Sequence, residues 1–283
     1  MGLGISRLIG LKATVLFLAF AYLRGLGLTL LPVPLLFASV VDFLVSIASH
    51  PSINLPLFLG KSTDGILPLW SRILFGPFLY FVRIFGWLRR LRSKEPPYTE
   101  ICEGLYVGGW PYSVDTLPPG DPAVIDCTCE LPRSEVIMRN AYLCIPTWDT
   151  RAPQPGEIES AVGWACRKRA QKRPVFIHCA FAIGLHKMAA IVDLLKPGLV
   201  LFVGHGRSVA VMCALIVALG MAEDWKNAEK IIQERRPCIR MNALHRKSLE
   251  EWSKHRLSSK RTDELGVSSV ILSAASGSSR SKS

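Results

Sequence analysis

The sequence lacks any arrangement of cysteines that would hold a metal ion or a disulfide framework. Its eight cysteines are scattered, and none forms a C-x-x-C pair or has the spacing of a zinc knuckle. His186 and His205 do not form a metal pair at helical spacing with Cys179. Most of the cysteines lie in apolar runs, where cysteine behaves as a small core residue. These absences exclude a zinc domain and a disulfide-rich secreted fold, and they indicate free thiols in a reducing compartment.

The first 97 residues are poor in acidic side chains. They hold 3 Asp/Glu against 10 Lys/Arg, within a chain whose formal net charge is +12. The remainder has no basic stripe with interleaved aromatic residues, which excludes a nucleic-acid surface. A positive excess on an apolar segment instead predicts an anionic membrane surface as the electrostatic partner.

Residues 13–48 form a nearly continuous apolar run that only Arg24 and Asp42 interrupt. The run is too long for the core of a signal peptide, and no small-residue cleavage site follows it. Two glycines and two prolines between residues 25 and 34 disfavour one straight helix. The run therefore predicts either one tilted span near residues 25–48 or a broken, re-entrant pair of helices.

A second apolar run, at residues 66–88, is rich in aromatic side chains that suit a membrane interface. A basic cluster follows it at once, whereas residues 49–65, between the two runs, hold one lysine and one aspartate. This distribution predicts that residues 1–94 are membrane-associated, as a hairpin of two spans with both ends in the cytoplasm. Two alternatives stay open: a buried helical hairpin packed on the soluble part, and a partner-binding helix at residues 70–87.

Residues 95–257 alternate short strands with helices, and the last residues, 258–283, form a Ser-rich, basic tail that we predict to be disordered. Buried strands are predicted at 104–109, 123–128, 142–147 and 174–179, and helices at about 154–172, 208–220, 224–236 and 243–257. Strands interleaved with helices predict an α/β domain whose sheet is covered on both faces.

The sequence also contains the parts that phosphoryl transfer through a cysteine requires. A predicted strand ends at Cys179, and Arg207 and Ser208 open an apolar helix. Asp149 lies at the end of the preceding strand, thirty residues before Cys179. In such chemistry a helix N-terminus and a cradle of amides bind the phosphate and lower the thiol pKa. An arginine holds two phosphate oxygens, and a separate acid protonates the leaving oxygen.

Four segments carry a family resemblance: VFIHCAF, GHGRSVAVMCALIVALG, PTWDTRAPQP and RPCIRMNALHRKSLEEW. They resemble the dual-specificity phosphatase family, in its membrane-attached plant-like branch, over about residues 98–257. The resemblance implies a three-layer α/β domain with a mostly parallel central sheet. It further implies hydrolysis of phosphotyrosine and phosphoserine/threonine esters, without a metal or a nucleotide cofactor.

The resemblance also implies a role for each site residue. Cys179 would be the nucleophile, Arg207 the phosphate clamp and Asp149 the general acid. Ser208 would assist release of the thiolate, and His178 would tune its pKa. The phosphate-binding loop would consist of Ala180, Phe181, Gly204, His205, Gly206 and Arg207.

This loop departs from the family pattern, which is His-Cys, five residues, then Arg-Ser. Joining Phe181 to Gly204 gives HCAFGHGRS, which fits that pattern at every position, but residues 182–203 stand between the halves. Consecutive amides must close around one phosphate, so the insertion is predicted to disable the site. The fold is predicted to survive, because the entropy of loop closure grows only logarithmically with length. An apolar segment within a complete motif is typical of a retained intron or an alternative splice product.

Three functions remain open at this point: a dual-specificity phosphatase impaired by its split loop, an inactive pseudophosphatase that binds partners, and a phospholipid phosphatase. The loop supplies a histidine but no lysine, which favours phosphoprotein over inositol phosphate. Membrane attachment favours the lipid.

Several of these residues also have simpler interpretations. Cys127, five residues, then Arg133-Ser134 repeats the spacing, but this segment has no glycine and contains a proline, so we predict a strand and turn. Asp149 would cap the helix that begins near residue 153. His178 would be a core histidine, and His245 is predicted to be a buried hydrogen-bonding residue.

Overall fold

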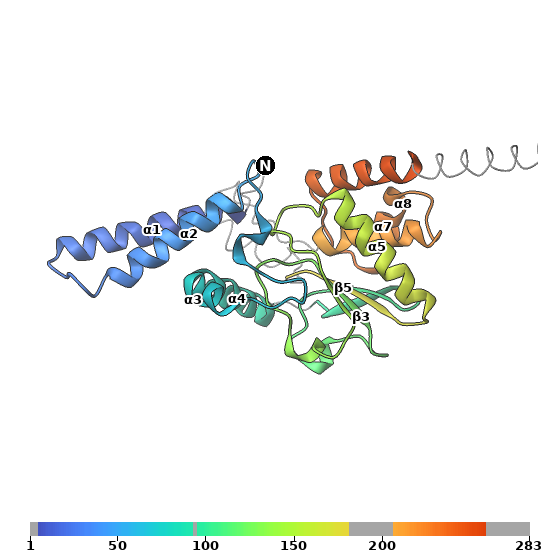
Figure 1. Cartoon of the computed structure of the whole chain (residues 1–283), viewed down its shortest axis with the longest axis horizontal. Coiled ribbons are helices and arrows are strands. Elements are labelled where there is room, and N and C mark those ends of the chain that lie inside the picture. The colour runs from blue at the N-terminus through green and yellow to red at the C-terminus, as the bar shows by residue number, and fades with distance from the viewer. Residues whose placement is uncertain (1–4, 93–94, 181–205, 259–283) are drawn as a thin grey trace, which may run out of the picture.

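The computed structural model describes residues 5–92, 95–180 and 206–258. It has a sheet-containing body and an N-terminal group of helices, from which one helical hairpin projects (Figure 1). The body is a mixed α/β fold with a mostly parallel central sheet, as the sequence predicts.

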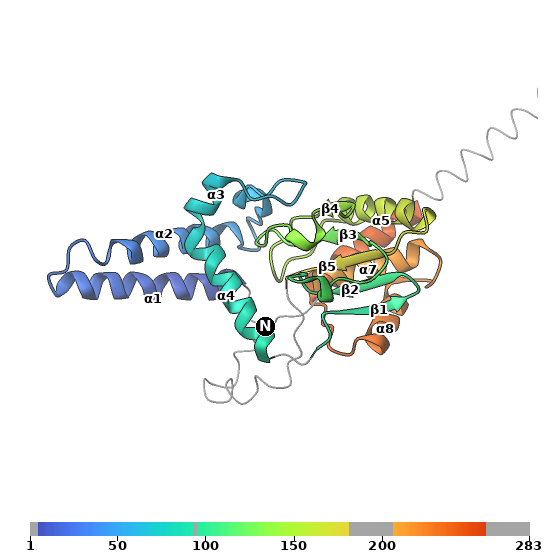
Figure 2. The same cartoon turned by 90° about the horizontal axis from the view of Figure 1, so that it is seen from below.

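The sheet has five strands in the order β1-β2-β5-β3-β4 (Figure 2). The strands are β1 (Tyr98–Cys102), β2 (Leu105–Gly108), β3 (Ala123–Asp126), β4 (Tyr142–Cys144) and β5 (Val175–His178). Strand β1 is antiparallel to β2, and the other neighbours are parallel. The four predicted strands are confirmed, whereas β1 is an edge strand that the sequence analysis did not predict.

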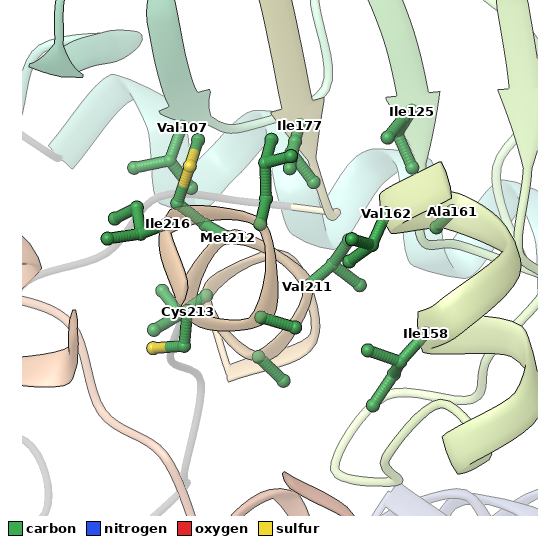
Figure 3. Packing of buried hydrophobic residues seen from close by; sticks show 14 of the residues in the cluster. Val107, Ile125, Ile158, Ala161, Val162, Ile177, Val211, Met212, Cys213 and Ile216 are labelled. Atoms are coloured by element: carbon green, nitrogen blue, oxygen red, sulfur yellow. The ribbon is translucent and has the colours of Figure 1, made fainter. Parts of the chain in front are cut away.

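The long helices of the body pack on one face of the sheet. They are α5 (Pro155–Ala170), α7 (Gly206–Ala218), α8 (Trp225–Arg235) and a last helix over residues 243–258. Helix α7 is central: every residue from Gly206 to Ile216 is buried. Its Met212 and Ile216 lie against Val107 and Ile177 of the sheet (Figure 3). Because a strand alternates its side chains between faces, alternate positions of β2, β3 and β5 point into this core.

The opposite face carries a thinner third layer. Val124 and Phe176 point to this side, and Ile137 covers them. Ile137 belongs to the short 3-10 helix η3 (Glu135–Ile137), and η2 (Val114–Thr116) precedes Leu117 in the same cluster. Helices were expected on both faces; on this one, short helical turns take their place.

The N-terminal helices are α1 (Ile5–Gly25), α2 (Val33–Ala48), η1 (Pro56–Leu59), α3 (Leu69–Leu74) and α4 (Gly76–Arg92). The first apolar run is thus a broken pair of helices and not one span, and its first helix begins at Ile5. Among the described residues, α1 is the one helix long and apolar enough to cross a membrane. Helix α1 ends at Gly25, where the glycines and prolines of residues 25–34 disfavoured one straight helix.

The segment from η1 to α4 packs directly on the body. Phe78 is fully buried, and its ring lies 6.2 Å from that of Trp148, edge to face. Leu59, Leu67 and Phe75 belong to the same buried cluster, which also includes Cys129, Leu131 and Ala180 of the body. One alternative from the sequence was a helical hairpin packed on the soluble part. Residues 56–82 do pack on the body, so this alternative holds for that segment.

Candidate active site

The candidate site lies where the carboxyl ends of β3, β4 and β5 meet the first turn of α7. Cys179 follows β5 at once, while Arg207 and Ser208 belong to the first turn of α7. Ser208 donates a hydrogen bond to the Cys179 sulfur over 3.4 Å. Cys179 and Arg207 are only 1% and 2% exposed. Two segments separated by 27 residues in the sequence are therefore adjacent in the fold.

Arg207 is held by two carboxylates. It donates to both oxygens of Glu130, at 3.1 and 2.8 Å, and to the carbonyl oxygen of Thr147 at 2.6 Å. A carboxylate oxygen of Asp149 lies 3.4 Å from the same guanidinium. Burial alone would lower the pKa of Arg207, but Glu130 and Asp149 outweigh it and raise that pKa well above its usual value. Arg207 therefore keeps its charge, and an incoming phosphate would compete with these carboxylates for it.

Asp149 does not cap the following helix. The N-cap of α5 is Gln154, whose capping box is completed by Glu157. Asp149 lies instead beside a small pocket of about 100 Å³, which Arg207 also lines. The capping interpretation is therefore wrong, and the carboxylate is next to the guanidinium.

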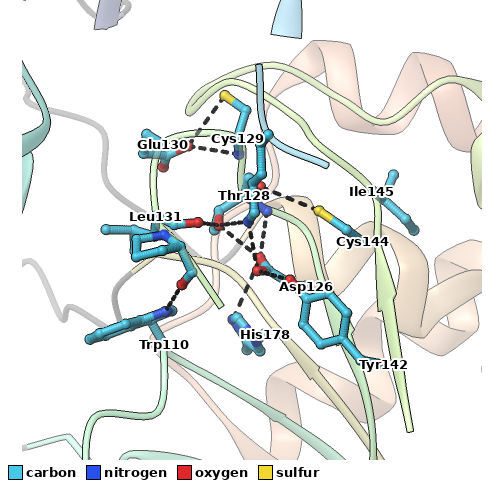
Figure 4. Close-up of polar contacts among 12 residues, drawn as sticks. Trp110, Asp126, Thr128, Cys129, Glu130, Leu131, Tyr142, Cys144, Ile145 and His178 are labelled. Carbon is cyan, nitrogen blue, oxygen red and sulfur yellow. Dashed lines mark hydrogen bonds and ion pairs between the residues drawn. The ribbon is translucent and has the colours of Figure 1, made fainter. Parts of the chain in front are cut away.

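A network of buried charges lies behind the cysteine. His178 and Asp126 are register partners on β5 and β3, with Nδ1 and Oδ1 3.9 Å apart. Asp126 accepts hydrogen bonds from the Tyr142 hydroxyl (2.7 Å) and the main-chain amide of Thr128 (2.8 Å) (Figure 4). The Lys61 ammonium donates a further hydrogen bond to Asp126 over 2.7 Å. His178 and Asp126 are both fully buried. The histidine thus lies next to a carboxylate that Lys61, Tyr142 and Thr128 orient.

The protonation states in this network follow from burial and from its one cation. Burial lowers the pKa of His178, which leaves the imidazole neutral at pH 7. Burial alone would raise the pKa of Asp126, but the nearby Lys61 ammonium opposes it and lowers that pKa to about 2. Burial would lower the pKa of Lys61, and Asp126 outweighs this to raise it. Lys61 and Asp126 therefore form a buried, fully ionised pair.

Lys61 is the site-region residue that the sequence analysis missed most clearly. It lies in the connection between the two apolar runs, 65 positions before Asp126, and its side chain is completely buried. It also donates to the carbonyl oxygen of Thr128 at 2.8 Å. One signal was available: a lone lysine within a mostly apolar and neutral connection. Its partner could not be found without the fold.

Gly206 is required by close packing at the start of α7. A Cβ at this position would lie 2.4 Å from the His245 ring, well inside van der Waals contact. His245 is 3% exposed and accepts a hydrogen bond from the amide of Asn242. The prediction that His245 is a buried hydrogen-bonding residue is thus confirmed.

The second cysteine-arginine motif begins directly after β3 and runs as bends and irregular backbone to η3, so the strand predicted for its first residues ends one position before it, at Asp126. Cys127 and Cys129 are buried, and burial raises the pKa of each thiol well above its usual value. Arg133 donates to the carbonyl oxygens of residues 137, 138 and 140, and so it closes a local turn. Glu130 of this motif is the residue that holds Arg207, a role that the sequence analysis did not predict.

Of the predicted phosphate-binding loop, the structure describes Ala180, Gly206 and Arg207. Ala180 is buried, and its carbonyl oxygen accepts from the amide of Trp110. Phe181, Gly204, His205 and the insertion at 182–203 lie outside the described residues, as does the predicted tail beyond Ser258. Within the described parts of the chain, no three His, Cys, Asp or Glu side chains are placed to hold a metal ion.

No protein-family model and no curated protein matches the chain. Among solved structures, it is similar to a variant of human DUSP28, with 13% identity and a TM-score of 0.45 over 58% of this chain and 99% of the other. A mouse putative dual specificity phosphatase, complexed with zinc tungstate, gives 13% identity and a TM-score of 0.44 over 59% and 93%. PTPMT1 in complex with PI(5)P gives 17% identity and a TM-score of 0.44 over 58% and 99%.

Proposed function

We propose that the site around Cys179 is a cysteine-dependent phosphatase site of the dual-specificity type, and that the insertion at 182–203 keeps it inactive in this chain. The observation that carries the proposal is the hydrogen bond from Ser208 to the Cys179 sulfur, beside an arginine that two carboxylates hold. A strand end, a helix start and an acid converge here, which is the set of parts that phosphocysteine chemistry uses.

In the intact loop, each described residue would have a defined task. The Cys179 thiolate would attack phosphorus, and Asp149 would give its proton to the leaving oxygen as the ester bond breaks. A phosphocysteine results. Asp149, now a carboxylate, would take a proton from water as the water oxygen attacks phosphorus, which releases phosphate and the thiolate. Ser208 would stabilise that thiolate through its hydroxyl, and Arg207 would hold the equatorial oxygens.

The insertion opposes this chemistry at one point. The phosphate has to displace Glu130 or Asp149 from Arg207, and it does so only if a cradle of amides also binds it. In this chain 27 residues, instead of five, separate the cysteine from the arginine. The carboxylates therefore keep the guanidinium, and the chain acts as a pseudophosphatase.

The test compares the full chain with the same chain lacking 182–203, each also carrying Cys179→Ser as its blank. Thermal unfolding first establishes that all four proteins are folded. Aryl-phosphate hydrolysis is then expected only from the deleted form with its cysteine. Hydrolysis by both cysteine-containing forms would overturn the role of the insertion, and hydrolysis by neither would overturn the phosphatase assignment.

Phosphoproteins are the proposed substrate class, since the intact loop would carry a histidine but no lysine. A phospholipid is the second candidate, and the apolar helices next to the site support it. The deleted form, given phosphopeptides and anionic phospholipid vesicles separately, distinguishes them by which one releases phosphate. We further propose that the N-terminal region attaches the chain to a membrane, with the site facing the cytoplasm.

A further inference from the structure

Serine side chains join the two helices of the hairpin formed by α1 and α2, whereas Thr14, Arg24 and Thr29 are exposed on it. Ser6 donates to the carbonyl oxygen of Ser46 at 2.8 Å, and Ser46 donates to that of Ser6 at 2.6 Å. Ser39 donates to the carbonyl oxygen of Ala13 at 2.8 Å. Small residues and serine hydroxyls at a helix–helix contact are typical of helices that associate within lipid, where no hydrophobic effect drives them together.

A charged pair also lies inside the hairpin. The Lys12 ammonium is 2.9 Å from a carboxylate oxygen of Asp42, whose side chain is fully buried. The same ammonium lies 4.0 Å from the centre of the Phe81 ring on α4. Apart from this pair, Arg24 is the single charged residue between positions 12 and 49. Opposite charges that neutralise each other inside a bundle are the form in which ionised groups are tolerated in a bilayer.

The outer surface of the hairpin is apolar. The large apolar side chains that are more than one-third exposed are Leu11, Val15, Phe17, Leu18, Tyr22, Val33, Phe37, Val40, Phe43, Leu44 and Ile47. A soluble monomer rarely exposes a continuous apolar surface of this kind. The polarity is therefore the reverse of that of a helical hairpin in water.

The turn of the hairpin is apolar too. Leu30 and Leu31 are 82% and 72% exposed. The amides of Leu26, Gly27 and Leu28 donate to carbonyl oxygens of α1, and two of the next positions are prolines, which have no amide hydrogen. Backbone groups in hydrocarbon must be hydrogen-bonded within the protein. The bonded amides and the prolines reduce the number of turn amides that would need water.

Both ends of the hairpin are fixed at the body. Arg151 donates twice to the carbonyl oxygen of Ser49, at 3.1 and 2.9 Å, directly after α2. Lys61 then inserts into the body beside Asp126. Since Ser6 contacts Ser46, the start of α1 lies at this same end. The connection at 49–65 is therefore on the side of the body, and not across a membrane from it.

We propose that α1 and α2 form a re-entrant membrane hairpin, which enters the bilayer from the side of the body, turns inside it at residues 26–32 and returns. With 16 residues, α2 is about 24 Å long, which is shorter than the roughly 30 Å hydrocarbon thickness of a bilayer. The α2 arm therefore does not reach the far side. The occupant of the apolar surface is thus lipid. The inference rests on the proposed membrane attachment, and it replaces the hairpin of two spans with a far-side connection that the sequence suggested.

The test uses cysteine labelling of the full chain in sealed proteoliposomes that hold it in one orientation. The native cysteines are replaced by serine, and one cysteine is introduced as Leu30→Cys at the turn, Ile53→Cys in the connection or Val114→Cys on the body. All three positions are well exposed. A membrane-impermeant maleimide is added outside, inside or after detergent. We expect Ile53→Cys and Val114→Cys to react from the same side, and Leu30→Cys to react only after detergent.

Each other outcome overturns the hairpin. Reaction of Leu30→Cys from the far side would make α1 and α2 full spans, and its reaction from the near side would place the hairpin in water. Reaction of Ile53→Cys from the side opposite Val114→Cys would restore a far-side connection. Extraction of the chain by alkaline carbonate would instead overturn the membrane attachment itself, and none of these readouts requires phosphatase activity.

Discussion

At the scale of single residues, the Lys61–Asp126 pair joins the N-terminal segment to the candidate site. Both side chains are completely buried, and each keeps its charge because the other is present. Removing one partner of a buried pair destabilises a protein far more than replacing both partners by apolar residues, because the remaining charge stays in a low-dielectric interior.

We therefore expect Lys61→Met to lower the free energy of unfolding by about 3–5 kcal/mol. Arg246→Met is the control, because Arg246 pairs with Glu229 but is half exposed, and such pairs contribute at most about 1 kcal/mol. Urea unfolding of the full chain in detergent measures both. Equal losses in the two variants would show that the buried pair has no special weight.

The acid sensitivity of the protein should depend on His245. Burial, and then Arg207, lowers the pKa of this histidine to about 3, whereas an unfolded histidine has a pKa of about 6.5. The unfolded state binds the extra proton between these values. The stabilisation is therefore complete above about pH 6.5, and it falls by up to about 1.4 kcal/mol per pH unit as the pH drops toward 3.

Urea unfolding between pH 7 and 4.5 checks this expectation. His245→Asn should unfold more easily at pH 7 but show a shallower loss with acid, and the exposed His255→Asn should keep the slope of the parent. If His245→Asn loses unfolding free energy with acid as steeply as the parent, the acid sensitivity comes from other groups, and His178 is the first to test.

At the scale of elements, the start of α7 is tightly packed against His245. Gly206→Ala would place a methyl group 2.4 Å from the His245 ring, so we expect a loss of about 1–3 kcal/mol. Gly163→Ala on α5 is the matched control, since its new methyl meets no atom closer than 3.7 Å; it should gain about 0.5–1 kcal/mol. Thermal unfolding compares the two, and a neutral Gly206→Ala would mean that His245 moves aside freely.

The sequence predicts those elements that local patterns form, and it does not predict contacts between residues far apart in the chain. Continuous apolar runs identified β2, β3, β4 and β5, because buried parallel strands need them. Strand β1, YTEIC, escaped because an edge strand is half polar. The same limit applies at the site: Cys179, Arg207 and Ser208 belong to local motifs, whereas Glu130 meets Arg207 across 77 positions and Lys61 meets Asp126 across 65.

At the scale of the whole molecule, the folded body includes residues before position 95. Phe75 and Phe78 fill a cluster with Trp148, and Lys61 neutralises Asp126. We expect a fragment of residues 95–258 to melt roughly 10 °C or more below one of residues 49–258, since it loses both the apolar contacts and the buried cation. Calorimetry in the same detergent measures the difference, and equal melting temperatures would show that the body folds by itself.

The position of Lys61 limits which shortened forms of this protein can fold. Many anchored proteins are modular: an alternative first exon or a proteolytic cut replaces or removes the anchor and leaves a working soluble form. Here the segment that follows the hairpin supplies the counter-ion of an aspartate next to the candidate nucleophile. A transcript that begins after residue 61 would encode a body with an uncompensated charge at its centre. Any soluble form must therefore retain this lysine or change Asp126 with it, so the two positions are expected to be gained and lost together.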